Sequence, residues 1–154
     1  MMKSILIIGA SNAGKSTTAQ EVCRQLKPTK VFRLDISKEE LNDAEIENIF
    51  NNTFIIEVNG KLILIVAGAT TEQGVKITAI MDVCIKLKLD ISFALVSMRS
   101  FERTEGFDTK NQLSSISEII LEERIFKINE EDFRNSKEWK SRIEKIVRLI
   151  KENI

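Results

Sequence analysis

The sequence predicts an α/β protein in three layers, with a mostly parallel sheet, helices on both faces and one β-hairpin. Apolar runs of strand length alternate with stretches that carry apolar residues at helical spacing. The first run, Ile5–Ile8, is wholly apolar, which is typical of a strand covered on both faces. Asn59-Gly60 separates two further runs and predicts a type I′ turn, because that turn needs positive φ at both positions.

The first half of the chain begins with that strand, and helical spacing predicts the helix that follows it. The capping-box pattern Ser37-Lys38-Glu39-Glu40 predicts another helix that runs towards Phe50. In order, we expect a strand at Ile5–Ile8, a helix through Ala19, Val22, Cys23 and Leu26, a strand at Val31–Ile36, a helix from Ser37, and paired strands at Phe54–Val58 and Lys61–Ala67.

The second half continues the alternation of helices and strands. Acidic residues from Glu130 to Asp132 predict the start of the last helix, since they favour the positive end of its dipole. In order, we expect a helix from Thr70 through Ile80, Val83, Cys84 and Leu87, a strand at Ile91–Ser97, a helix through Leu113, Ile116, Ile119 and Ile120, a strand at Arg124–Ile128, and a final helix with Trp139, Ile143, Ile146, Val147 and Ile150 on its apolar face.

The composition limits the classes of function. The 154 residues include 23 basic and 23 acidic side chains, so the chain lacks the basic excess of a non-specific nucleic-acid binder. The chain has no histidine, which excludes histidine general-base catalysis and most catalytic zinc sites. The length suits one domain over residues 1–154.

The cysteines and the apolar runs bear on the compartment. Cys23 and Cys84 form no CxxC or Cys/His pattern, so we expect two buried thiols in a reducing cytosol. Ile5–Ile8 is too short for the core of a signal peptide, and no apolar run approaches about 18 residues. We therefore expect a cytoplasmic protein without a membrane partner, and the sequence indicates no oligomeric state.

One motif carries specific chemistry. The segment from Gly9 to Ser16 reads G-A-S-N-A-G-K-S and matches the complete Walker A pattern, between a predicted strand and a predicted helix. Its glycines let the backbone wrap round a phosphate, so that N–H groups point at the phosphate oxygens. Lys15 would contact β- and γ-phosphate oxygens, and the Ser16 hydroxyl would bind Mg²⁺. The expected nucleotide-binding residues are Gly9, Ala10, Ser11, Asn12, Ala13, Gly14, Lys15, Ser16 and Thr17.

Through this motif and the order of its elements, the chain resembles the P-loop nucleoside-triphosphate-binding superfamily over nearly its whole length. The small P-loop kinases are the most similar group. The resemblance implies a P-loop NTPase fold that binds ATP, or alternatively GTP, with Mg²⁺. It further implies phosphoryl transfer to a small acceptor, or hydrolysis.

Three side chains outside the motif extend the resemblance to small-molecule kinases. Asp35 ends the second predicted strand, where those kinases often carry an acid that faces the acceptor. Arg99 and Arg103 resemble the two arginines of a lid that stabilises the transferring phosphoryl group. The candidate catalytic residues are therefore Lys15, Asp35, Arg99 and Arg103. Asp35 as a residue that starts a helix, and the arginines as ordinary loop charges, are the structural alternatives.

The strand at Lys61–Ala67 departs from the family pattern, because it ends without the acid that usually organises the magnesium site. Glu72 and Asp35 are the two acids that could replace it, although Glu72 also suits the first turn of a helix. The missing acid also favours an alternative function. In this alternative, the chain is a non-catalytic nucleotide-binding module that switches a partner.

A GTPase-like protein with degenerate motifs is the remaining alternative. The hairpin around Asn59-Gly60 followed by Ala67-Gly68 resembles the paired strands and switch glycine of small GTPases. Their D-x-x-G motif would place its acid at Ile65, and their N-K-x-D motif would fall at positions 129–132, where Glu130 replaces the lysine. A plain helix N-cap at Asn129 accounts for the same residues. ATP is therefore favoured over GTP.

Overall fold

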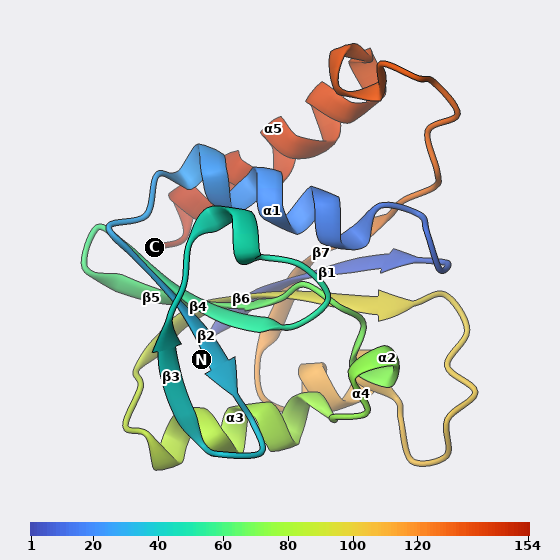
Figure 1. Cartoon of the computed structure of the whole chain (residues 1–154). Helices are drawn as coiled ribbons and strands as arrows, with labels where there is room; N and C mark the ends of the chain where they lie inside the picture. The colour runs from blue at the N-terminus through green and yellow to red at the C-terminus, as the bar shows by residue number, and fades with distance from the viewer.

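One seven-stranded sheet forms the centre of the computed structural model, which describes residues 1–154 (Figure 1). The strand order is β3-β2-β4-β5-β6-β1-β7. The strands are β1 (Lys3–Gly9), β2 (Lys30–Asp35), β3 (Glu40–Asp43), β4 (Thr53–Val58), β5 (Lys61–Val66), β6 (Ile91–Arg99) and β7 (Glu118–Arg124). The helices are α1 (Lys15–Leu26), α2 (Thr70–Gln73), α3 (Ile77–Lys86), α4 (Thr109–Ser114) and α5 (Lys137–Glu152), with short 3₁₀ turns η1 (Ile46–Asn48) and η2 (Phe133–Asn135).

The sheet is mixed, which corrects the predicted fold class. β5, β6, β1 and β7 run parallel to one another, whereas the β3–β2, β2–β4 and β4–β5 pairs are antiparallel. Half of the strand pairs are therefore antiparallel, and the chain forms two hairpins. The prediction of a three-layer P-loop NTPase fold with a mostly parallel sheet and one hairpin is wrong. The broader α/β class is confirmed.

The main error lies between Ser37 and Phe50, where the structure has a hairpin in place of the predicted helix. The Asp35 carboxylate accepts hydrogen bonds from Ser37 Oγ (2.9 Å) and the Lys38 backbone N–H (3.0 Å). This turn sends the chain back as β3, antiparallel to β2. Side chains such as Ser and Asp stabilise turns as well as helix starts, so the capping-box pattern here marks a turn.

Two further predictions in the second half are corrected. The helix expected through Ile119 and Ile120 ends at Ser114, and these isoleucines lie in β7. β7 in turn ends at Arg124, so the strand predicted at Arg124–Ile128 is absent. A short run of β-branched and apolar residues fits a buried helix or a strand equally well, and pairing with β1 decides for the strand.

Two helix boundaries also differ from the prediction. The helix expected from Thr70 is broken at Gly74 into α2 and α3. The last helix begins at Lys137 and not at Glu130, because the Ser136 side chain caps it by accepting a hydrogen bond from the Trp139 N–H (3.1 Å). The predicted apolar face of α5 is buried as expected.

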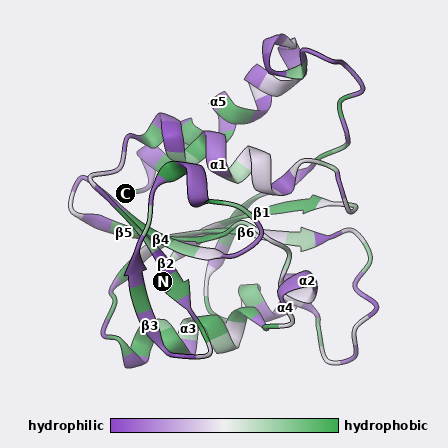
Figure 2. Cartoon of the chain, viewed as in Figure 1, coloured by the Kyte–Doolittle hydropathy of each residue, from purple (hydrophilic) through white to green (hydrophobic).

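Apolar side chains fill the space on both faces of the sheet, and Figure 2 shows the central strands as the most hydrophobic part of the chain. α1 and α5 cover one face, while α3 and α4 lie across the other (Figure 1). Cys23 and Cys84 are buried free thiols, one in each core, as the sequence predicted. None of the helices combines the length and the apolar character needed to cross a bilayer.

The carboxyl ends of the parallel strands meet at one edge of the sheet. Gly9 at the end of β1 pairs with Arg99 at the end of β6, and β6 also pairs with β5. β6 therefore lies between the strand that leads into the Gly9–Ser16 loop and the strand that leads into α2. Ligands of α/β proteins generally bind beyond this edge, so the loops that leave these three strands are the place to look for a site.

Candidate functional site

The Gly9–Ser16 loop joins the end of β1 directly to the start of α1. Asn12 and Gly14 adopt positive φ angles of 65° and 98°, which turns the chain sharply into the helix. The first N–H groups of an α-helix have no partner within the helix, and the dipole makes this end positive. The loop therefore presents backbone donors of the kind that hold anions.

Lys15 closes over this loop. Its ammonium group donates hydrogen bonds to the carbonyl oxygens of Gly9 (2.9 Å) and Ala10 (2.8 Å), and the side chain is only 5% exposed. Burial lowers the pKa of Lys15, and the nearby Arg99 lowers it further, whereas Glu72 opposes the shift. The Lys15 ammonium group is thus held at the mouth of the loop by two carbonyl oxygens, and a phosphate oxygen could take their place as hydrogen-bond acceptor.

Ser16 is surrounded by oxygen atoms. Its hydroxyl lies 3.1 Å from Asn51 Oδ1 and 3.0 Å from the Ala67 carbonyl oxygen, and it accepts a hydrogen bond from the Asn51 N–H (3.0 Å). Hydroxyl, amide and carbonyl oxygens are ligands that suit Mg²⁺. No group of three or more acidic, cysteine or histidine side chains that could hold a metal is present in the chain.

Asn51 reaches Ser16 because the segment before β4 packs against Gly68. A Cβ atom on Gly68 would lie 2.4 Å from the Asn51 carbonyl oxygen, so only glycine allows this approach. Sequence reasoning missed Asn51. The available signal was weak, namely an Asn-Asn pair before a strand, where asparagine tolerates the positive φ of 52° that it adopts.

Glu72 links the loop to the arginine at the end of β6. Glu72 Oε1 lies 3.8 Å from Lys15 Nζ and 3.9 Å from Arg99 Nε. Its carboxylate also lines two cavities, one over the Gly9–Ser16 loop (about 390 Å³) and one beside it (about 400 Å³). Glu72 therefore stands at the boundary between the two cavities.

We call the second cavity the arginine pocket. Its lining residues are Ala10, Thr71, Glu72, Arg99, Ser100, Phe101, Arg103 and Thr104. Sequence reasoning placed Arg99 and Arg103 in one site, and the structure brings both of them to this pocket, next to the loop.

A third cavity (about 280 Å³) opens on the other side of the loop and shares Asn12, Gly14 and Thr17 with the cavity over the loop. Its far wall consists of Lys127, Ile128, Glu130, Phe133, Trp139 and Arg142. The Arg142 guanidinium is buried and donates hydrogen bonds to Thr18 Oγ1 (3.2 Å) and the Phe126 carbonyl oxygen (3.1 Å), and burial lowers its pKa. This arrangement fixes α5 against α1 beneath the loop. Sequence reasoning treated α5 only as a packing helix.

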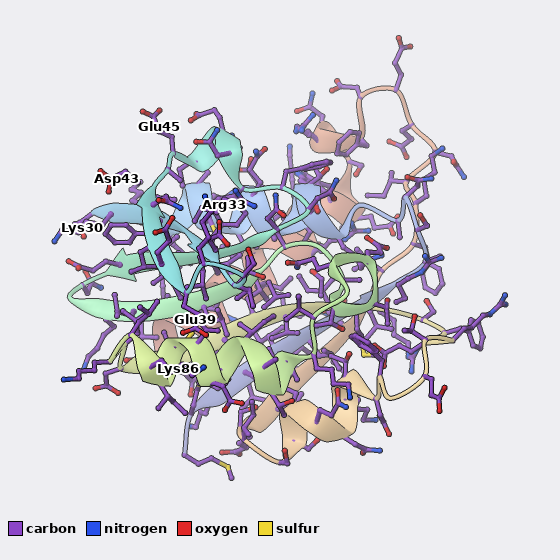
Figure 3. The ribbon with its side chains drawn as sticks, turned by 60° about the horizontal axis from the view of Figure 1, so that its bottom comes forward. Lys30, Arg33, Glu39, Asp43, Glu45 and Lys86 are labelled. Carbon is purple, nitrogen blue, oxygen red and sulfur yellow. The ribbon has the colours of Figure 1, made fainter.

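The structure does not bring Asp35 to the loop. β4, β5 and β6 lie between β2 and β1, which at about 4.8 Å per strand is roughly 19 Å across the sheet. Asp35 instead holds the β2–β3 turn, and its pKa is lowered chiefly by the hydrogen bond from the Lys38 N–H. The same hairpin is tied to α3 by an ion pair between Glu39 and Lys86 (3.0 Å), which lie side by side in Figure 3.

No protein-family model, curated protein or solved structure matches the chain. The function therefore has to be inferred from the site itself.

Proposed function

We propose that this protein binds a nucleoside triphosphate, with ATP favoured, together with Mg²⁺, and transfers the γ-phosphoryl group to a small acceptor or to water. The observation that carries the proposal is the complete Walker A loop at the start of α1, with the buried Lys15 ammonium closed over it. The proposal rests on this loop and its neighbours and not on the overall fold. It keeps the cytoplasmic location expected from the sequence.

In this proposal the phosphates occupy the cavity over the loop, and the ribose and base extend into the third cavity. Asn12, Gly14 and Thr17 line both cavities, so one ligand can span them. The ring of Trp139 and the ring of Phe133 contribute an apolar wall to the third cavity. Such a wall suits the flat face of a heteroaromatic base.

The residues around Ser16 fit a magnesium ion that arrives with the triphosphate. Mg²⁺ commonly keeps several waters and takes few protein ligands when phosphate oxygens complete its shell. Ser16 would hold the ion, and Asn51 lies next to it on the same wall. Bound there, Mg²⁺ would neutralise charge on the phosphates.

Glu72, and not the sequence candidate Asp35, is the proposed general base, because it lines both the cavity over the loop and the arginine pocket. The acceptor oxygen attacks the γ-phosphorus, and its proton passes to the Glu72 carboxylate. The bond between the γ-phosphorus and the β–γ bridging oxygen breaks, and its electron pair stays on that oxygen of the leaving diphosphate. Arg99, beside Glu72, stabilises the negative charge on the transferring group.

Substitution of the loop lysine tests the proposal. We expect Lys15→Ala to abolish ATP binding measured by isothermal titration calorimetry, because it removes the cation aimed at the phosphates. Lys61→Ala is the matched control, since Lys61 is exposed at the start of β5, on the opposite edge of the sheet. An unchanged affinity in Lys15→Ala would refute the loop assignment, provided that circular dichroism shows the variant to be folded.

A phosphate-release assay separates the enzyme from a nucleotide-binding switch. We expect turnover that depends on Mg²⁺ and is higher with ATP than with GTP. Tight nucleotide binding without release or transfer of phosphate, with candidate acceptors present, would contradict the catalytic part of the proposal. It would favour the switch.

A further inference from the structure

We propose that the arginine pocket is the acceptor subsite and that it selects a small organic molecule with an anionic group, a phosphate monoester or a carboxylate. Arg103 recognises this anionic group, and a hydroxyl of the same molecule is the oxygen that attacks the γ-phosphorus and gives its proton to Glu72. This inference rests on the proposed function, since it identifies the class of molecule that would receive the phosphoryl group. It assigns the two arginines different tasks. The sequence had placed both on the transferring phosphoryl group.

The position of the pocket suits an acceptor. Its wall includes Ala10 of the loop and Glu72, which also lines the cavity proposed for the phosphates. A molecule in the pocket would therefore meet the γ-phosphate at the proposed general base. The volume of about 400 Å³ lies in the range of small-molecule sites.

The charge of the pocket calls for an anion. The lining holds two arginines, Arg99 and Arg103, and one carboxylate, that of Glu72. One oxygen of that carboxylate, Oε1, is shared between Lys15 and Arg99. Arg103 forms no ion pair within the protein. Guanidinium groups bind carboxylates and phosphates with paired hydrogen bonds, which makes such a group the matching ligand.

Two further side chains of the lining lack partners in the protein. The Thr71 hydroxyl is buried and forms no hydrogen bond, although buried polar groups are nearly always paired. Phe101 is 78% exposed beside Arg103, so its ring is free to cover the apolar part of a ligand. An organic anion with a charged and an apolar portion can contact both Arg103 and Phe101, whereas inorganic phosphate would leave Phe101 uncovered.

The walls of the pocket are held in place by a hydrogen-bonded group below them. Glu102 accepts hydrogen bonds from both the backbone N–H and the hydroxyl of Thr109, at the start of α4. The Thr109 hydroxyl also lies 2.6 Å from Thr70 Oγ1, at the start of α2. This group joins the loop of Arg103 to the helix of Glu72. Because Glu102 is occupied there and does not line the pocket, it leaves the charge of Arg103 uncompensated.

The first test uses phenyl phosphate and benzoate as probes, with benzyl alcohol as the neutral control, in NMR titrations of the full-length protein. We expect one or both anions to bind and benzyl alcohol not to bind. Arg103→Met should lower the affinity for the anion about tenfold or more, which is the usual effect of losing a hydrogen bond to a charged group. Arg33→Met is the matched control, because Arg33 is an exposed arginine on β2 (Figure 3), and β4 and β5 separate β2 from β6, which carries Arg99 of the pocket.

Lys15→Ala separates the pocket from the loop. We expect the affinity for the anion to stay within about twofold in Lys15→Ala, because Arg103 and not Lys15 holds the probe. If Lys15 did donate a charged hydrogen bond to the anion, its removal would lower the affinity by more than this. Loss of binding in Lys15→Ala, or equal binding by Arg103→Met and Arg33→Met, would overturn the inference. Whichever anion binds more tightly assigns the acceptor class.

An ATP titration of the same samples keeps the two proposals apart. We expect Arg103→Met to bind ATP as the wild-type protein does, because Arg103 contacts the acceptor and not the nucleotide. If ATP affinity falls in Arg103→Met while anion binding persists, Arg103 contacts the phosphoryl group of the nucleotide and not the acceptor. That result would refute the subsite. A wild-type protein that fails to bind ATP would refute the proposed function, and the acceptor role with it.

Discussion

Replacing Gly68 with alanine should disturb the Ser16 site through backbone contact alone. In the structure, an added Cβ would lie 2.4, 2.6 and 2.8 Å from the carbonyl oxygen, carbonyl carbon and Cα of Asn51. All three are backbone atoms, so no flexible side chain can move aside. Ordinary van der Waals contact begins at 3.4 Å, and the Asn51 backbone must therefore withdraw by about 1 Å.

That displacement sets the size of the effect. Asn51 contacts Ser16 Oγ at 3.0 and 3.1 Å, and about 1 Å more would take both contacts beyond hydrogen-bonding distance. Two lost hydrogen bonds cost about 0.5–1.5 kcal/mol each, and overpacking costs a further 1–3 kcal/mol or so. We expect a loss of stability of roughly 2–6 kcal/mol, which at about 2–4 °C per kcal/mol lowers the Tm of a chain of this size by roughly 5–20 °C.

Thermal unfolding and calorimetry with ATP measure the two consequences. Gly68→Ala should lower the Tm and should lower the affinity for Mg·ATP about tenfold. The effect on ATP without Mg²⁺ should be smaller, because Ser16 is proposed to contact the nucleotide through the magnesium ion. Gly60→Ala is the control. Gly60 has a positive φ but open space around it, so alanine there costs about 1–2 kcal/mol of backbone strain and leaves ATP affinity unchanged. Wild-type stability and affinity in Gly68→Ala would refute the idea that this contact positions Ser16.

Three further predictions test other parts of the site and the core. Glu72→Gln should lower phosphoryl transfer about 10²–10⁴-fold while ATP affinity changes little, as expected for a general base; equal turnover would remove Glu72 from the mechanism. Asp35→Asn should leave turnover unchanged. Because the pKa of Asp35 is lowered in the folded protein, the stability it adds is present at neutral pH and disappears as the pH falls through that pKa, so urea unfolding should distinguish the variant at pH 7 and not at strongly acidic pH. Burial raises the pKa of Cys84 to about 11, so a disulfide reagent at pH 8 should label neither cysteine until urea unfolds the chain, and rapid native labelling would contradict the buried core.

Sequence patterns predicted the elements whose signals were unambiguous. The apolar β1, the Asn59-Gly60 hairpin and the apolar face of α5 all formed where expected. The prediction failed where two structures compete for one pattern. Ser37–Glu40 serves a helix start or a turn, and Ile119–Leu121 fits a helix or a strand, so pairing across the sheet decides each case.

The candidate site divides in the same way. The Gly9–Ser16 loop is contiguous in the sequence, so its place between β1 and α1 could be predicted, while its role in nucleotide binding stays a prediction. Its neighbour Arg99 lies at the end of β6. Asn51 and the choice of Glu72 over Asp35 depend on which strands are neighbours. The strand order places β6 next to β1 and β5 next to β6, and it separates β2 from β1 by three strands. No local pattern carries this information, because it arises from contacts between segments distant in the chain.

The hydrogen bonds of Lys15 to its own loop have a thermodynamic consequence. In the proposed function, an incoming phosphate would compete with the Gly9 and Ala10 carbonyl oxygens for the ammonium group and would not meet a hydrated, mobile side chain. Most of the dehydration and immobilisation of Lys15 is therefore completed during folding and is absent from the binding step. A nucleotide bound as proposed would exchange these partners, which favours a ligand whose charge exceeds that of two carbonyl dipoles. Such an exchange would discriminate against neutral molecules before any contact with a base.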